Sequence, residues 1–376
     1  MTQDLLMLKE KNKMEHTCSF CSNFTFGFEK KISKEYSLKS KPMIRGKEVK
    51  LSEAIHEIKK ILKLSNSIHI DGMDCDISTI DKIFSFAERH RCSVNHMDSQ
   101  KINNLYLSYS KYGGSFVSLN EIKNRADLIM FLGVDKNQLC EKFLRKIKWS
   151  KKKVQSSIFF ISPKQDTIHL KKNNLTYEKI LENINKLHFL IDDKKPKKGE
   201  FLKLSNSFSK SKYPIIIVDI GSLNSVLTLA IYDLVYAINK KKRLRIYNLF
   251  GSNNSSGFVN SCVTKTGFPN AVVFTDNGAE YDPYQINSNV LMKNVDLQLY
   301  FSNFSETPNK NFFKKNIFLG NPNAKNKKKF DVYIPTKTPG VDKNGLSVRS
   351  DGISIIKHKQ VLDSSYKSIK EILTQI

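Results

Sequence analysis

Short, nearly continuous apolar runs alternate with amphipathic helical segments along most of this sequence. Pro214–Ile220 (PIIIVDI) is one such run, and Leu223–Asn239, which has the apolar spacing of an α-helix, follows it directly. A strand that is apolar on both faces needs cover on both faces, as in parallel sheets flanked by helices. The pattern therefore predicts an α/β protein in which right-handed crossovers build Rossmann-like layers.

The same criteria place the other elements. Strands are expected at 67–71, 128–132, 157–162, 244–250, 271–275, 297–301 and 331–334. Helices are expected at 54–62, 78–87, 119–125, 137–148, 177–187 and 366–374, with polar connections at 192–212, 303–315 and 322–329. Two of the helices begin with a capping-box pattern, formed by Ser78 with Asp81 and by Ser118 with Glu121.

The formal charge of +26 is carried mainly by lysine, because only eight of the 62 basic residues are arginine. Base reading and bidentate phosphate binding favour arginine. We therefore interpret the charge as solvated surface, with nucleic-acid binding as the second interpretation. No apolar run is long enough to cross a membrane, and the N-terminal residues lack the apolar core of a secretory signal. A cytoplasmic protein is expected.

Cys18 and Cys21 are the only two of the six cysteines that lie close together in the sequence. Thiolates two residues apart can share a zinc ion or one iron of a cluster, but a closed site needs two more ligands. No second pair of this spacing exists. The residues alone favour two ordinary thiols over a bound metal.

Other motifs are weak. The sequence has no P-loop, no dinucleotide-binding fingerprint and no nucleophile elbow. The loop 251–257 (GSNNSSG) could face an anion, but it has no lysine, and an ordinary strand-to-helix turn is favoured. His96, Asp98 and Ser99 bring a base, an acid and a hydroxyl close together in sequence. Side chains at such offsets rarely converge, so we expect His96 to be structural.

The segment Tyr112–Gly133 (YGGSFVSLNEIKNRADLIMFLG) resembles the B subunit of formylmethanofuran dehydrogenase and its bacterial counterparts in formyltransferase/hydrolase complexes. In that family a glycine is followed here by a helix cap. An acidic residue and an Arg-Ala-Asp run come next and lead into a strand that ends in glycine. Further matches lie at 47–54, 95–96, 266–269, 281–283, 334–336 and 349–352. The resemblance extends over residues 16–376.

The resemblance implies the formate dehydrogenase/DMSO reductase-like fold of molybdopterin oxidoreductases (domains I–III), without the C-terminal pterin-binding domain of longer relatives. It implies two Rossmann-like parallel-sheet lobes, one inserted in the other, and a small N-terminal lobe. The expected boundaries are 1–46 for the N-terminal lobe with a degenerate iron–sulfur region, 47–98 and 246–340 for the first α/β lobe, 99–245 for the inserted lobe, and 341–376 for a β-rich tail and helix.

The sequence departs from the dehydrogenase pattern at both metal sites. Cys18 and Cys21 match the first two ligands of the four-iron cluster, but Thr25 stands at the third. The segment Met97–Asn103, where the dehydrogenase ligates tungsten or molybdenum through sulfur, contains no cysteine. Oxygen and amine groups do not replace a thiolate on such a metal. We therefore expect no catalytic, cofactor-binding or metal-binding residues, and interpret Cys18 and Cys21 as a remnant of a lost iron–sulfur site.

The resemblance implies a non-catalytic scaffold subunit of a formyltransferase/hydrolase complex, which converts formyl-tetrahydromethanopterin to formate in tetrahydromethanopterin/methanofuran-linked one-carbon metabolism. The implied partners are the hydrolase (A), formyltransferase (D) and C subunits, which would hold the methanofuran-type carrier and the hydrolase metals. Two alternatives stay open. A redox-active B subunit of formylmethanofuran dehydrogenase predicts bound pterin, and a basic nucleic-acid-binding protein predicts salt-sensitive binding. Lys325 and the lysines 327–329 are a candidate surface for acidic partners.

Overall fold

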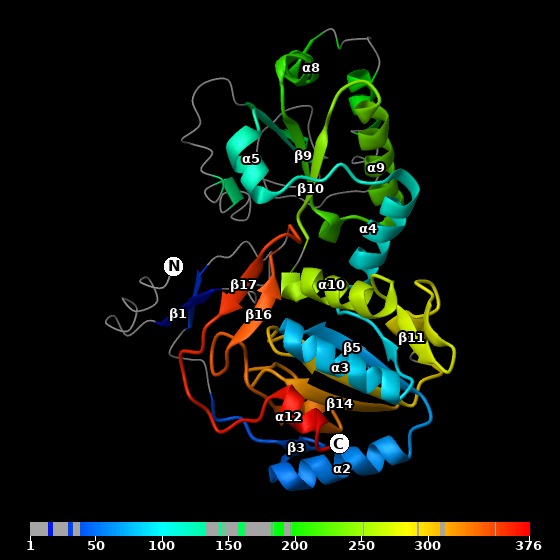
Figure 1. Cartoon of the computed structure of the whole chain (residues 1–376), viewed down its shortest axis with the longest axis vertical. Helices are drawn as coiled ribbons and strands as arrows, with labels where there is room; N and C mark the ends of the chain where they lie inside the picture. The colour runs from blue at the N-terminus through cyan, green and yellow to red at the C-terminus, as the bar shows by residue number, and fades with distance from the viewer. Residues whose placement is uncertain are drawn as a thin grey trace. The chain divides into compact units, whose positions relative to one another are not determined.

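The chain forms two compact units in the computed structural model (Figure 1). The first combines residues 1–99 with 251–376 and is called unit 1; the second, 100–250, is called unit 2. The structure describes residues 14–17, 29–32, 38–132, 143–144, 147, 157–161, 182, 184–191, 196, 198–250, 252–291, 293–308, 313–349 and 351–376. Cys18, Cys21 and Thr25 lie outside these residues, as does most of the predicted helices 137–148 and 177–187.

A nine-stranded sheet is the centre of unit 1. Its strands are, in spatial order, β12 (Gly278–Tyr281), β11 (Val272–Thr275), β6 (Ser93–Val94), β5 (Ile68–Asp74), β13 (Leu297–Ser302), β14 (Lys315–Gly320), β15 (Val332–Pro335), β3 (Met43–Ile44) and β4 (Lys47–Glu48). The five strands from β6 to β15 are parallel, as predicted. The outer strands pair antiparallel. Tight turns join β3 to β4 and β11 to β12, and a tight turn permits only antiparallel pairing.

Helices and a hairpin complete unit 1. The helices are α2 (Leu51–Lys63), α3 (Ile77–Arg89), α10 (Ser255–Thr266), α11 (Ser288–Leu291) and α12 (Ile369–Leu373). The hairpin pairs β16 (Gly345–Val348) with β17 (Ile355–His358), and α12 follows it in the chain. α3 packs against α10, α12 and β16, whereas α2 packs against β15 and β3. Separately, β1 (Met14–Thr17) and β2 (Glu29–Ile32) form an antiparallel pair.

Unit 2 contains a fully parallel four-stranded sheet. Its strands are β10 (Arg245–Asn248), β9 (Pro214–Val218), β7 (Leu128–Leu132) and β8 (Ser157–Ile161). Its helices include α4 (Ser99–Tyr112), α5 (Leu119–Arg125), α8 (Glu200–Lys210) and α9 (Ser225–Asn239), with a 3-10 turn at Leu187–Leu190. Strands β7, β8, β9 and β10 all lie where the apolar runs predicted them.

The structure differs from the sequence-based predictions in several places. The polar connection predicted at 192–212 contains α8, whose Leu204 and Phe208 are buried one helical turn apart among lysines and serines. The strand β14 was not predicted, because its short apolar core lies between two lysine-rich stretches. The helix α3 is not capped by Ser78: it begins at Ile77, and Asp76 is its N-cap residue.

The capping box at the start of α5 is confirmed and gives a first prediction. Ser118 Oγ accepts a hydrogen bond from Glu121 N at 3.1 Å, and Glu121 Oε2 accepts one from Ser118 N at 3.1 Å. Ser118→Ala is expected to lower the free energy of unfolding of unit 2 by about 1 kcal/mol, because one backbone N–H loses its partner. Hydrogen exchange of the α5 amides measures the loss. Ser209→Ala is the control, since its hydroxyl donates to Ser205 O within α8 and caps no helix; equal losses would contradict the prediction.

Candidate functional site

The carboxyl ends of the parallel strands of unit 1 carry polar side chains that are almost completely buried. They are Asp74 at the end of β5, Asn95 after β6, Ser302 and Asn303 at β13, Asn321 after β14 and Thr336 after β15, each 0% exposed. In open α/β sheets, ligands bind outside the carboxyl ends of the strands, where the strand order reverses. Here the order reverses beside β5, because β6 lies on one side of it and β13 on the other. We therefore treat this edge as the candidate site and call it the carboxyl edge.

A bulge at the end of β5 sets the position of Asp74. Phe301 pairs with Gly72 and Ser302 pairs with Asp74, so Met73 is the extra residue. Gly72 and Met73 both have left-handed backbone angles, with φ of +84° and +59°. A Cβ on Gly72 would lie 2.4 Å from Phe301 O, so only glycine fits there. Such strained backbone concentrates at functional sites.

Asp74 is a buried carboxyl group with one satisfied oxygen. Its Oδ2 accepts hydrogen bonds from Ser302 Oγ at 3.0 Å and from Ser305 N at 2.8 Å. Its Oδ1 is buried without a hydrogen-bond partner. Burial raises the pKa of Asp74 to about 8, against the weaker opposite effect of these two hydrogen bonds. Asp74 is therefore mostly protonated and uncharged at neutral pH.

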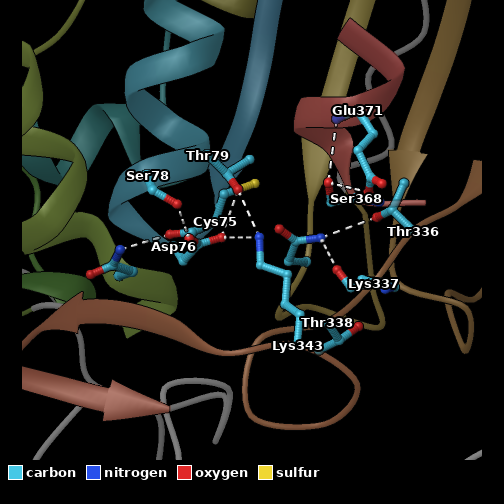
Figure 2. A network of polar contacts seen from close by, with 12 residues as sticks. Cys75, Asp76, Ser78, Thr79, Thr336, Lys337, Thr338, Lys343, Ser368 and Glu371 are labelled. Atoms are coloured by element: carbon cyan, nitrogen blue, oxygen red, sulfur yellow. Dashed lines mark hydrogen bonds and ion pairs between the residues drawn. The ribbon is translucent and has the colours of Figure 1, made fainter. Parts of the chain in front are cut away.

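Asn303 links β13 to the segment that follows β15. Its Nδ2 donates to Thr336 Oγ1 at 3.1 Å and to Lys337 O at 3.0 Å, contacts that can be followed in Figure 2 from Thr336 and Lys337. Its Oδ1, like Asp74 Oδ1, is buried and has no hydrogen-bond partner. The side chain is thus held in place mainly by its amide nitrogen.

An ion pair joins the carboxyl edge to the chain's own C-terminal part. Figure 2 shows Lys343 reaching Asp76 and Thr79 at the start of α3: its Nζ is 2.7 Å from Asp76 Oδ1 and 3.0 Å from Thr79 Oγ1. Thr79 Oγ1 and Ser78 Oγ also donate to the Asp76 carboxylate, at 2.6 and 2.7 Å. Asp76 is 1% exposed and Lys343 15%. Burial alone would raise the pKa of Asp76, but Lys343 and the two hydroxyls together lower it, so the carboxylate stays charged.

Cys75 lies between the two aspartates and is an inert thiol. It is 0% exposed, and burial raises its pKa well above the ordinary value, with a further contribution from Asp74 and Asp76. Asn254 fixes the backbone here, since its Nδ2 donates to Cys75 O at 2.7 Å while its Oδ1 accepts from Val348 N at 2.9 Å. Asn254 precedes α10, so the loop in 251–257 supplies a structural turn, as predicted, over its described residues.

The predicted structural role of His96 is confirmed. Its Nδ1 accepts a hydrogen bond from Asp98 N at 3.0 Å, and its Nε2 lies 3.2 Å from Asn253 O. This pattern places the proton on Nε2, so both ring nitrogens are engaged with the backbone. The side chain is 1% exposed and packs against Phe258, with ring centroids 5.1 Å apart.

The described residues do not fit a tungsten or molybdenum centre at the carboxyl edge. The cysteine at this edge is Cys75, which burial keeps protonated, and 97–103 offers no sulfur from cysteine. Cys92 and Cys262 are also buried, and burial raises the pKa of each thiol to about 12. Within the described part of the chain, no three His, Cys, Asp or Glu side chains converge as metal ligands would. Cys18 and Cys21 are outside that part.

Sequence reasoning missed the residues that form the carboxyl edge. Asp74, Asp76 and Lys343 were not singled out, although one signal existed. The run Asp71–Asp76 (DGMDCD) places two acidic residues in the buried strand β5 and a third just after it. Acidic residues are common in solvated loops, so this run is not unusual as sequence. It becomes unusual only when the structure shows that the side chains are buried.

Comparisons with known proteins show similarity in fold. No protein-family model matches the chain, and no curated protein matches it. One chain of the crystal structure of the formyltransferase/hydrolase complex (FhcABCD) from Methylorubrum extorquens, determined with methylofuran, matches with a TM-score of 0.76 at 15% identity, over 89% of this chain and 97% of that chain. Acetylene hydratase from Pelobacter acetylenicus matches with a TM-score of 0.54 at 11% identity, over 96% of this chain and 69% of that chain.

At these identities the likeness establishes the fold and leaves the activity open. None of the helices in the described residues has the length and apolar character needed to span a bilayer. The predicted α/β class with parallel sheets is confirmed, and the protein has the fold of a chain from a formyltransferase/hydrolase complex.

Proposed function

We propose that this chain is a non-catalytic scaffold subunit of a formyltransferase/hydrolase complex in tetrahydromethanopterin/methanofuran-linked one-carbon metabolism. The proposal is supported by the fold similarity, which extends over 97% of a chain from such a complex. The segment Tyr112–Gly133, which carries the sequence resemblance, includes the capped helix α5 and the strand β7. In this proposal the hydrolase, formyltransferase and C subunits are the partners, and the carrier and hydrolase metals belong to them.

The burial of the side chains at the carboxyl edge is the observation that carries the proposal. In an α/β enzyme this edge would bind substrate or cofactor. Here the chain's own Lys343 pairs with Asp76 over it, and the strand-end side chains are 0% exposed. Cys75 presents a protonated thiol rather than a nucleophile or metal ligand. A fold whose strand-end side chains are buried in this way fits a role in holding partners.

Purification of the complex with a tag on this chain tests the proposal. Mass spectrometry is expected to find hydrolase and formyltransferase subunits in fixed ratio, and metal analysis to find tungsten and molybdenum far below one per chain. Pterin bound in stoichiometric amount, together with formate-linked dye reduction, would instead establish the redox-active alternative and refute the scaffold role.

A separate variant tests whether Cys18 and Cys21 still bind iron. Cys18→Ser with Cys21→Ser is expected to leave the iron content and the subunit ratio of the purified complex unchanged, because two thiolates do not hold a four-iron cluster alone. Loss of stoichiometric iron in this variant would mean that the two residues still ligate a cluster, and the proposed remnant would be a working site.

A further inference from the structure

Aromatic side chains gather on one surface of unit 2, over α4 and α9. Tyr106, Tyr109 and Tyr112 lie on α4 at helical spacing, Phe116 follows this helix, and Tyr236 lies on α9. Phe116 is 45% exposed and Tyr236 is 46% exposed. The rings form two groups, with contacts inside each group. Ring centroids are 5.1 Å apart for Tyr106 and Tyr109 and 4.6 Å for Tyr109 and Phe116, and in the second group they are 6.0 Å apart for Tyr112 and Tyr236.

Two lysines belong to the same surface. Lys111 Nζ lies 5.2 Å from the ring centroid of Tyr112, and Lys240 Nζ lies 4.6 Å from that of Tyr236. Both lysines are exposed. We call the five aromatic residues and these two lysines the tyrosine–lysine face. Phe116 and Tyr236 are exposed and the three tyrosines of α4 are half-buried. Partly exposed aromatic side chains with a polar border are a common composition of a protein interaction site.

A rigid layer supports the face. Tyr232 lies beneath it, 1% exposed, with its ring 5.1 Å from that of Tyr109. Asn248 at the end of β10 donates from Nδ2 to both hydroxyls, at 2.8 Å to Tyr109 and 2.7 Å to Tyr232. Because these rings are already fixed in place, binding would cost little conformational entropy.

The charge of unit 2 indicates the kind of partner. Residues 100–250 contain 29 Lys and Arg against 12 Asp and Glu, a net charge of +17 out of the +26 of the whole chain. The helices α4 and α9 together contain one acidic residue, Asp233. Charge complementarity therefore favours an acidic partner.

Ring geometry decides between an acidic protein and a single-stranded nucleic acid. Bases stack on open, flat ring faces. The rings of this face are tilted against one another by 44° to 59°, and lysine ammonium groups of the same chain lie over Tyr112 and Tyr236. The charges of the face are also lysine rather than arginine, which is the better fit to phosphate. These features favour carboxylates as the partner groups.

We propose that the tyrosine–lysine face is a docking surface for the acidic surface of a partner protein. The tyrosine and phenylalanine rings would form the buried centre of the contact, and Lys111 and Lys240 would pair with partner carboxylates at its border. The inference rests on the proposed scaffold role, and it identifies the part of the scaffold that holds a partner.

Binding of a chemically defined probe tests the face on the full chain. The probe is a fluorescein-labelled acidic peptide of repeated Glu-Glu-Leu units, measured by anisotropy at low salt. Tyr236→Ala with Lys240→Ala is expected to weaken binding about tenfold, the effect of losing central contacts. The matched control, Tyr284→Ala with Lys210→Ala, removes one exposed tyrosine and one exposed lysine elsewhere. It is expected to change binding less than about twofold.

Two results with probes would overturn the proposal. Equal weakening in both variants would mean that the peptide responds to total charge. Selective weakening of oligo-dT, with the peptide unaffected, would assign the face to single-stranded nucleic acid. Unchanged thermal midpoints in both variants show that the fold is intact, as the exposure of the replaced side chains leads us to expect.

Purification of the complex from cells separates this proposal from the scaffold role. Loss of a partner subunit with Tyr236→Ala/Lys240→Ala, but not with the control, supports both. Retention of all partners by that variant overturns the docking surface and leaves the scaffold role standing. If the unaltered chain co-purifies with no hydrolase or formyltransferase subunit, the scaffold role fails. The peptide measurement alone then decides whether the tyrosine–lysine face binds acidic partners.

Discussion

Lys343→Met is expected to lower the free energy of unfolding of unit 1 by about 3–5 kcal/mol, the effect of leaving a buried charge without its partner. Methionine keeps most of the apolar stem of the lysine but removes its ammonium group. Asp76, at 1% exposure, would then keep a carboxylate supported only by the hydroxyls of Ser78 and Thr79. Hydrogen exchange of the β5 and α3 amides reports the loss in unit 1 separately from unit 2.

A double variant distinguishes the lost pairing from lost packing. Asp76→Asn with Lys343→Met removes both charges, so it is expected to recover much of the stability lost in the single variant. Lys357→Met, on the exposed side of β17, is the control for removing a lysine and should change stability by less than about 0.5 kcal/mol. If the single variant cost no more than this control, the ion pair would not be what stabilises the carboxyl edge.

The sequence predicted the central strands of both sheets because burial on two faces leaves a clear apolar signature. Ile129–Leu132 and Ile215–Val218 illustrate this, since all their residues are buried. The strand β14 escaped because Lys315 and Asn316 occupy its first positions, although Asn316 is 5% exposed. That asparagine is buried through hydrogen bonds to the Phe313 backbone, which no periodicity reveals.

The candidate site was harder to predict because its groups come from distant parts of the chain. Lys343 and Asp76 are 267 residues apart, and only the fold brings them to 2.7 Å. The lysine-rich stretch 325–329 was predicted to be solvated surface, and Lys325, Lys328 and Lys329 are exposed. Lys327 is not a solvated residue: it donates to Ser40 Oγ and to Pro322 O, lies over the Tyr333 ring, and burial lowers its pKa.

The stability of unit 1 is expected to depend on pH through Asp74, and the burial of this carboxyl group sets the direction of the change. Burial raises the pKa of this carboxyl group from 3.8 to about 8 in the folded protein. Between these values the folded state holds a proton that the unfolded chain has released. The contribution of Asp74 to stability is therefore fully present below pH 4 and is lost as the pH rises toward 8. The loss is about 1.4 kcal/mol per pH unit across that window.

Asp74→Asn is expected to remove this dependence while keeping the hydrogen bonds that orient the side chain. The amide oxygen can accept from Ser302 Oγ and Ser305 N, and the amide nitrogen replaces the unpartnered oxygen. The thermal midpoint of the variant should be close to that of the unaltered protein at pH 4 and clearly higher at pH 8. Asp233→Asn, on the exposed side of α9, should show no such change.

A constant difference between the Asp74→Asn variant and the unaltered protein from pH 5 to pH 8 would mean that Asp74 is already ionised in the fold. The edge beside Asp76 would then hold two negative charges, and Lys343 would have to balance both.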